Sequence, residues 1–178
     1  MDEMANTIET MFSMGARIKA LSDIPGIDDI VILVEGISIT RREIETQSIL
    51  DNSYGAVLLK ETVDDIIREK AVQAEAVLLG IEPSQDNINS YLEQIRLGFE
   101  NDVTGNELLL SYLEGMEMTV EEYLETMDKV AYVMFQGGAL RASIESLQTY
   151  KTYEEYANDL MSKAKVEIFD PEIKSLFE

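Results

Sequence analysis

Hydrophobic residues along the chain recur mostly at three- and four-residue spacing, which is the pattern of helices buried along one face. The first stripe lies in residues 4–21 and consists of Met4, Ile8, Met11, Phe12, Gly15 and Ile18. Further stripes of this kind predict helices over residues 41–50, 56–79, 85–100, 106–113, 120–147 and 153–164. The inward stripe of the helix over 56–79 includes Val77 and Leu78, and that of the helix over 120–147 includes Val130 and Met134. The chain is therefore predicted to be mainly helical.

Helix boundaries carry capping signals. A Ser or Thr side chain at the N-cap accepts a hydrogen bond from a backbone N–H of the first turn, and a Glu three residues later accepts one from the N-cap backbone N–H. Gly is common just after a helix, because it readily adopts the left-handed conformation needed there. The signals are two capping boxes (Thr40 with Glu43, and Thr119 with Glu122), an N-cap at Ser84 and a C-terminal stop at Gly80. Turn signals in "DNSYG" (51–55) and "NDVTG" (101–105) separate neighbouring helices.

Two segments have the pattern of β-strands instead. Residues 30–40, "IVILVEGISIT", predict a hairpin that turns at Glu35-Gly36, and "VEIF" at 166–169 predicts one more strand, ended by Pro171. A lone two-stranded ribbon is marginally stable in water. We therefore expect the late strand to pair with the hairpin. The expected fold class is mainly α with a small β-sheet (α+β), closed from end to end by the pairing of the N-terminal hairpin with the C-terminal strand.

The same reasoning divides the chain into two parts. Residues 1–29 are interpreted as an N-terminal amphipathic helix and linker, and residues 30–178 as a single domain. Gly137 and Gly138 lie inside a predicted helix, where each costs roughly 1 kcal/mol relative to Ala. Either another backbone approaches closely at this point, or the helix kinks or breaks.

Charge and composition exclude several functions. Among 178 residues, 35 are acidic and 14 are basic, which gives a net charge of −21. This balance opposes binding to nucleic-acid phosphates or to anionic lipid surfaces. It is explained either by solubility or by a preference for basic client proteins. No apolar run is long enough to span a membrane, and the acidic start "MDEMANTIETMF" lacks the apolar segment of a secretory signal.

The residue types also limit the chemistry. The chain contains no Cys and no His, so thiol nucleophiles, disulfides, structural zinc sites and His-based catalysis are excluded. Neighbouring carboxylates such as Asp64-Asp65 and Glu121-Glu122 diverge on a helix and do not converge in a cleft. We therefore expect no cofactor, no metal site and no enzymatic activity. A carboxylate-based hydrolase or metal enzyme is the alternative that this reasoning disfavours most.

Methionine is the one residue type that indicates binding. The chain has nine Met and no Trp, and "YLEGMEMT" (112–119) places two of the methionines beside an interhelical turn. Flexible thioethers at a surface suit varied apolar partners, although a Met stripe at helical spacing is more often core. The pattern is a weak indication of non-specific polypeptide binding.

Four segments together resemble one protein family. "VEGISITRREIE" resembles the "V-N-G-x-x-I-T-x-x-E" start of the SurA/PrsA-type extracytoplasmic chaperones, whose core is related to trigger factor. Three further segments resemble later parts of the same family, in the same order along the chain. They are "LLKETVDDIIREKAVQAEAVLLGIEPSQDNINSYLEQIR", "GMEMTVEEYLETMDKVAYVMFQGGALRASI" and "YANDLMSKAKVEIF". The resemblance covers about residues 30–170. Glu35 stands where that family usually has Asn.

A larger departure concerns catalysis. Family members usually carry a parvulin-type proline isomerase domain between the late helix and the C-terminal helix, where this chain has only residues 148–152. No parvulin signature and no His is present, so the resemblance does not imply isomerase activity. It implies the chaperone module alone, working outside the cytoplasm at the cell wall or in the periplasm. It leaves open both an anchoring segment upstream of the chain and a cytoplasmic location.

The resemblance implies a helical groove that holds unfolded or partly folded client polypeptides without catalysis. Candidate lining residues are Phe99, Tyr112, Met116, Met118, Tyr132, Met134 and Phe135, although core packing favours the same residue types. Family members often dimerise, and the N-terminal helix is a candidate for a homodimer contact or a domain swap. The alternative is a scaffold or self-association module with one dedicated protein partner.

Overall fold

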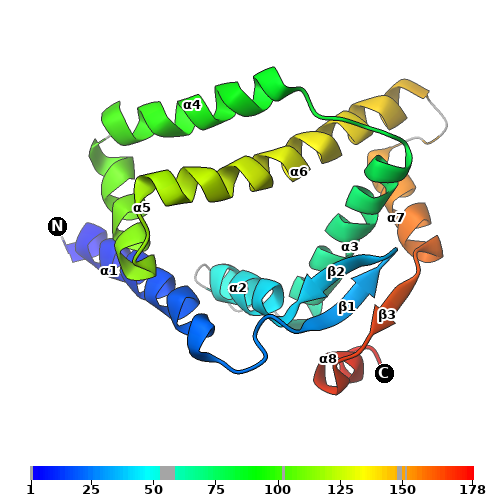
Figure 1. The fold of residues 1–178 in the computed structure, drawn as a ribbon, viewed down its shortest axis with the longest axis horizontal. Helices are drawn as coiled ribbons and strands as arrows, with labels where there is room; N and C mark the ends of the chain where they lie inside the picture. Colours follow the sequence, from blue (N-terminus) through cyan, green and yellow to red (C-terminus); the bar gives the residue numbers. More distant parts are fainter. Residues whose placement is uncertain (1, 53–58, 102, 148–149, 151) are drawn as a thin grey trace.

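The structure is a computed structural model that describes residues 2–52, 59–101, 103–147, 150 and 152–178 (Figure 1). The described helices and strands follow the order α1 (Asp2–Ala20), the 3-10 helix η1 (Leu21–Asp23), β1 (Ile30–Val34), β2 (Ile37–Thr40), α2 (Arg41–Asn52), α3 (Leu59–Leu78), α4 (Gln85–Asn101), α5 (Val103–Met116), α6 (Val120–Leu147), α7 (Tyr153–Lys163), β3 (Val166–Ile168) and α8 (Pro171–Ser175). The mainly helical fold class with a small sheet is confirmed.

The predicted sheet closure is also confirmed. The three strands lie in the order β2-β1-β3, and both pairs are antiparallel. Ile32 in the central strand pairs with Ile39 on one side and with Ile168 on the other. Glu35 (φ 50°) and Gly36 (φ 85°) form the hairpin turn, and two positive φ angles are what a tight type I′ connection requires. Strands from opposite ends of the chain thus complete one sheet.

The main core lies between this sheet and the helices that pack on it. Its buried members are Val31, Ile32, Val34, Ile39, Ile44, Val63, Ile66, Ile67, Ala71 and Ile173. Ile173 belongs to α8, a short helix that the sequence reasoning did not predict. Pro171 was expected only to end the strand, but it is also the first residue of α8, and the Asp170 carboxylate accepts from the backbone N–H groups of Glu172 and Ile173. Pro at this position lacks only an N–H that the helix would leave unpaired.

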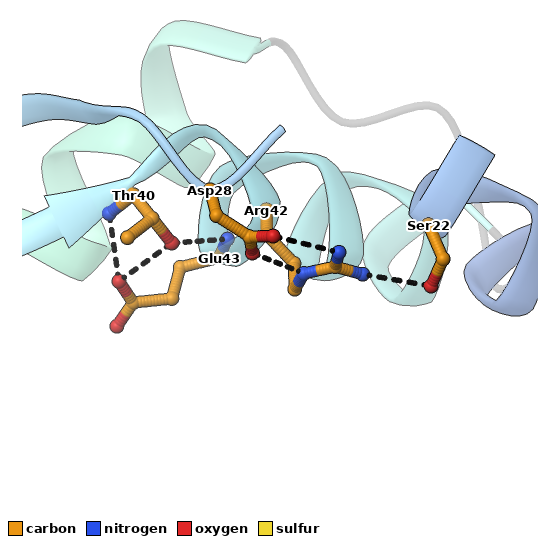
Figure 2. A network of polar contacts seen from close by, with 5 residues as sticks. All are labelled: Ser22, Asp28, Thr40, Arg42 and Glu43. Carbon is orange, nitrogen blue, oxygen red and sulfur yellow. Dashed lines mark hydrogen bonds and ion pairs between the residues drawn. The ribbon is translucent and has the colours of Figure 1, made fainter. Parts of the chain in front are cut away.

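The N-terminal part is joined to α2 by a polar network (Figure 2). The guanidinium of Arg42 donates two hydrogen bonds to the carboxylate of Asp28, at 2.6 Å and 3.2 Å, and a third to Ser22 Oγ at 3.3 Å. Beside it the predicted capping box is present, since the Thr40 backbone N–H donates to Glu43 at 2.7 Å and Glu43 N–H donates back to Thr40 Oγ1 at 3.3 Å. The guanidinium also lowers the pKa of Asp28, because it bonds the charged form.

A close crossing of α1 and α5 occurs at two glycines that were not predicted to have this role. α1 packs more extensively on α5 than on any other described element. A Cβ atom on Gly15 would lie 2.1 Å from the carbonyl oxygen of Tyr112, and one on Gly115 would lie 2.1 Å from that of Phe12. Each helix therefore presents a bare backbone to the other, which only Gly allows.

The pair Gly137-Gly138 meets no neighbouring backbone and does not break α6. α6 continues through both residues to Leu147. A Cβ on Gly137 would meet only a side-chain carbon of Val72, at 4.0 Å, and one on Gly138 would meet nothing within 4 Å. The expected close backbone approach and the expected helix break are therefore both wrong for this pair, and the expected kink stays a prediction.

Other predictions need correction. α5 begins at Val103 and ends at Met116, so the expected loop over 101–105 and the helix limits 106–113 were wrong. Val77 and Leu78 were expected to face inward but are largely exposed, while Ala76 is buried. Gly80 (φ 64°) does terminate α3 as predicted, since its N–H donates a hydrogen bond to the carbonyl of Val77 and the N–H of Ile81 donates one to the carbonyl of Ala76. The expected start of α3 at 56 and most of the "DNSYG" turn lie outside the described residues.

Candidate functional site

A groove of about 800 Å³ lies between α3 and α6, and we call it the α3/α6 groove. Figure 1 shows α6 running from the end of the molecule that holds α1 and α5 to the end that holds α3 and α7. The lining residues come from α2, α3 and α6 and are Glu43, Glu69, Lys70, Val72, Gln73, Lys129, Val130, Val133, Met134 and Gly137.

The α6 side of the groove is apolar and open to solvent. Val130, Val133 and Met134 are 49%, 39% and 47% exposed. They lie three and four residues apart, so they share one face of the helix. Gly137 continues this face by one turn without adding a side chain, and Val72 of α3 supplies an apolar residue opposite. The groove therefore offers a row of uncovered apolar side chains rather than a convergent polar site.

The α2 end of the groove is polar. Lys70 Nζ lies 2.8 Å from Glu43 Oε1 in an ion pair. Partial burial raises the pKa of Glu43, but the hydrogen bonds from Lys70 and from the Thr40 backbone outweigh it and leave that pKa lowered. Partial burial raises the pKa of Glu69 in the same wall. Because Lys129 completes the lining, acidic and basic residues are balanced in this groove.

Of the seven residues predicted to bind clients, Met134 is the one that lines this groove. Tyr132 is on the same helix, but its hydroxyl donates to Glu82 at 2.7 Å, and that hydrogen bond raises the pKa of Tyr132. Phe135 packs edge to face on Tyr91 of α4, with ring centroids 5.9 Å apart.

The other four predicted residues lie elsewhere. Phe99 of α4 packs edge to face on Tyr123 of α6 at 6.2 Å. Tyr112 and Met116 pack against the buried cluster that α1 forms with α2. Met118 is half-buried in the connection between α5 and α6. The structure thus distributes the seven residues over at least three surroundings and does not bring them into one surface.

Sequence reasoning passed over Val133 and Val72, and it assigned Val130 to an inward stripe. A usable signal is the run "VAYVMF" at 130–135, which is apolar on every side of the helix. A helix segment that is apolar on every side is normally buried by neighbouring elements. Where a neighbour is missing, one apolar side is left exposed to solvent. Here Ala131 is buried and Phe135 packs on α4, while the opposite side faces the groove.

In the part of the chain that the structure describes, no group of three or more acidic side chains is placed to hold a metal ion. None of the described helices combines the length and apolarity that crossing a membrane requires.

Comparisons of the chain with protein-family models, with curated proteins and with solved structures find no match. The resemblance to the SurA/PrsA-type chaperones therefore stays a prediction from short motifs.

Proposed function

We propose that this protein is a chaperone-like module that binds unfolded or partly folded polypeptide segments in the α3/α6 groove and catalyses no reaction. The observation that carries the proposal is the uncovered row of Val130, Val133 and Met134 on α6. Apolar side chains along a groove take up apolar client side chains with little demand for a particular sequence, and Met adapts to varied shapes.

The expected strength of binding suits a reversible holder. Full burial of one such side chain contributes about 1.5–3 kcal/mol, and these three are already more than half covered. Covering the row therefore contributes on the order of 2–4 kcal/mol, which corresponds to weak binding unless the client makes other contacts. A client held in this way is released readily, and the net charge of −21 keeps the complex soluble.

The motif resemblance supports the same function and adds a location outside the cytoplasm to the proposal. The proposal contains no proline isomerase step, because the chain has no His and no parvulin-like segment.

Suppression of aggregation tests the proposal. The protein is mixed in equimolar amount with a chemically denatured client, the client is diluted from denaturant, and light scattering is followed. We expect reduced scattering for several unrelated clients, with no acceleration of prolyl isomerisation in a peptide assay. Absence of suppression across the clients would contradict the proposal.

A matched pair of variants assigns the effect to the groove. Val130→Glu/Met134→Glu places two charges in the groove and should abolish suppression. Leu59→Glu/Leu110→Glu is the control and adds the same two charges, because Leu59 on α3 and Leu110 on α5 are 43% and 45% exposed, close to the 47% of Met134, but lie outside the groove. If both variants lose suppression equally, general surface apolarity is responsible and the groove is not the site. Recovery of a single stoichiometric partner without any holding activity would favour the scaffold alternative.

A further inference from the structure

A second groove, on the other side of α6, has a different chemical character. It lies between the C-terminal half of α4 and the first turns of α6, has a volume of about 600 Å³, and we call it the α4/α6 groove. Its lining residues are Leu92, Arg96, Phe99, Glu100, Val120, Glu121, Leu124 and Glu125. It shares no residue with the α3/α6 groove.

The floor of this groove is apolar. Leu92, Phe99, Val120 and Leu124 are half-buried, so each keeps part of its side chain open to a ligand. Phe99 is held in place by its edge-to-face contact with Tyr123. The position of the floor is thus set by the packing of α4 on α6.

The edges of the groove are acidic. Glu100, Glu121 and Glu125 are exposed, and none of them forms an ion pair with another described residue. The one basic residue, Arg96, lies 3.5 Å from a carboxylate oxygen of Glu93 on its own helix. The groove therefore presents three uncompensated negative charges around an apolar floor.

A comparison within the molecule shows that this is a property of the α4/α6 groove and not of every hollow in an acidic protein. The groove between α3 and α7 also carries three carboxylates, those of Glu35, Glu75 and Asp159. Each of these already accepts a hydrogen bond from the protein, and Asp159 also pairs with a Lys. Each of these three carboxylates therefore has a hydrogen-bond partner within the protein.

We infer that the α4/α6 groove is a docking site for a basic amphipathic polypeptide segment, in which two or three apolar side chains are flanked by Lys or Arg. The apolar side chains would cover Leu92, Phe99 and Leu124, and the flanking cations would approach the carboxylates at the edges. Charge complementarity of this kind increases the association rate and selects against acidic segments. In the described part of the chain these carboxylates do not form a group that could hold a metal ion. Their negative charge is complementary to a cationic side chain.

The probe is a fluorescently labelled twelve-residue peptide that contains two Leu and one Phe flanked by Lys, with a second peptide in which every Lys is replaced by Glu. Fluorescence anisotropy of the full chain with each peptide is measured at low and at physiological ionic strength. We expect binding of the Lys peptide that weakens with salt, and no measurable binding of the Glu peptide. Equal binding of the two peptides would overturn the inference.

Two charge-matched variants place the site. Glu100→Gln/Glu121→Gln/Glu125→Gln removes three charges from the groove. The control variant Glu9→Gln/Glu61→Gln/Asp64→Asn removes three exposed charges from α1 and α3, so the two variants have the same net charge. We expect the groove variant to weaken binding of the Lys peptide by roughly 3- to 30-fold, and the control variant by less than about twofold because salt screens distant charges. An equal loss in both variants would mean that net charge alone attracts the peptide, and the inference would fail.

A third variant separates this inference from the proposed function. Val130→Glu/Met134→Glu alters only the α3/α6 groove and should leave binding of the Lys peptide within about twofold, apart from a small gain from added negative charge. A large loss in that variant would place the peptide in the wrong groove and overturn the inference. Circular dichroism of each variant confirms that the helical fold is retained.

Discussion

Replacing either glycine of the α1–α5 crossing with Ala places a methyl group inside the backbone of the neighbouring helix. At Gly15 the new Cβ would lie 2.1 Å from the carbonyl oxygen of Tyr112 and 2.9 Å from the backbone nitrogen of Met116. At Gly115 it would lie 2.1 Å from the carbonyl oxygen of Phe12 and 2.8 Å from the nitrogen of Ala16. Backbone atoms of a helix cannot rotate away as a side chain does, so the helices themselves must separate.

The size of the effect follows from these distances. Ordinary contact begins near 3.4 Å, so a Cβ at 2.1 Å requires the helices to move apart by about 1.3 Å. Overpacking of this kind costs about 1–3 kcal/mol. Ala returns up to roughly 1 kcal/mol through its higher helix propensity. Because the separation also loosens the cluster of Met14, Ile18 and Leu21 beneath the crossing, we expect a net loss of about 1–3 kcal/mol.

Chemical and thermal unfolding followed by circular dichroism measure this loss. For a chain of this size, 1 kcal/mol corresponds to a change in Tm of about 2–4 °C. The matched control is Gly138→Ala, since a Cβ at that position meets no atom within 4 Å and the helix is continuous there. That variant should gain up to roughly 1 kcal/mol.

The double variant Gly15→Ala/Gly115→Ala is a further check. Both methyl groups separate the same two helices, so the second should cost less than the first and the losses should not add. If either single variant is as stable as the parent protein, the two helices do not cross at these glycines and the reasoning is refuted. The same conclusion follows if Gly138→Ala is destabilised to the same extent as Gly15→Ala.

Three further predictions concern other parts of the fold. Ile173→Ala should lower the free energy of unfolding by about 2–5 kcal/mol in urea titrations, because it opens a cavity in the core beneath the sheet; a change below 0.5 kcal/mol would show that α8 does not contribute to that core. Glu43→Gln should lose the ion pair with Lys70 and lower the free energy of unfolding. Because the pKa of Glu43 is lowered in the folded protein, the stability difference between parent and variant should be complete above about pH 4.5 and be lost as the pH falls through the folded pKa. An unchanged difference at pH 3 would contradict this. Tyr156→Phe should remove a hydroxyl that donates to Glu75 at 2.9 Å, and because the folded pKa of Tyr156 is raised, the parent protein should lose stability above about pH 10 more steeply than the variant; parallel alkaline unfolding curves would refute the assignment.

Local features were those that the sequence predicted best. The capping boxes at Thr40 and Thr119 and the stop at Gly80 are present because each depends on residues within four positions of one another. The hairpin turn at Glu35-Gly36 is of the same kind. The pairing of the late strand with this hairpin was predictable for another reason, since two isolated strands in a helical chain have few partners other than each other.

The candidate site was predicted less well. Periodicity identifies an apolar face, but it does not say whether another helix covers that face. The spacing of Val130 and Met134 is the same whether α3 packs against them or is separated from α6 by a groove. The distance between two helices depends on contacts between residues far apart in the chain, and α8 was missed because its burial depends on such contacts with the sheet.

Four helical glycines show most clearly the difference between what local sequence predicts and what depends on tertiary packing. Gly15, Gly115, Gly137 and Gly138 all lie inside helices, and helix propensity assigns the same cost to each. Most of the helices, their caps and the closure of the sheet follow from the sequence, because they depend on local hydrogen bonds and on the periodicity of apolar residues. That Gly15 and Gly115 meet a neighbouring backbone while Gly138 meets open space follows from how the helices pack in the assembled fold. The physical reason is that close packing acts between surfaces, and which surfaces meet is a property of the assembled fold.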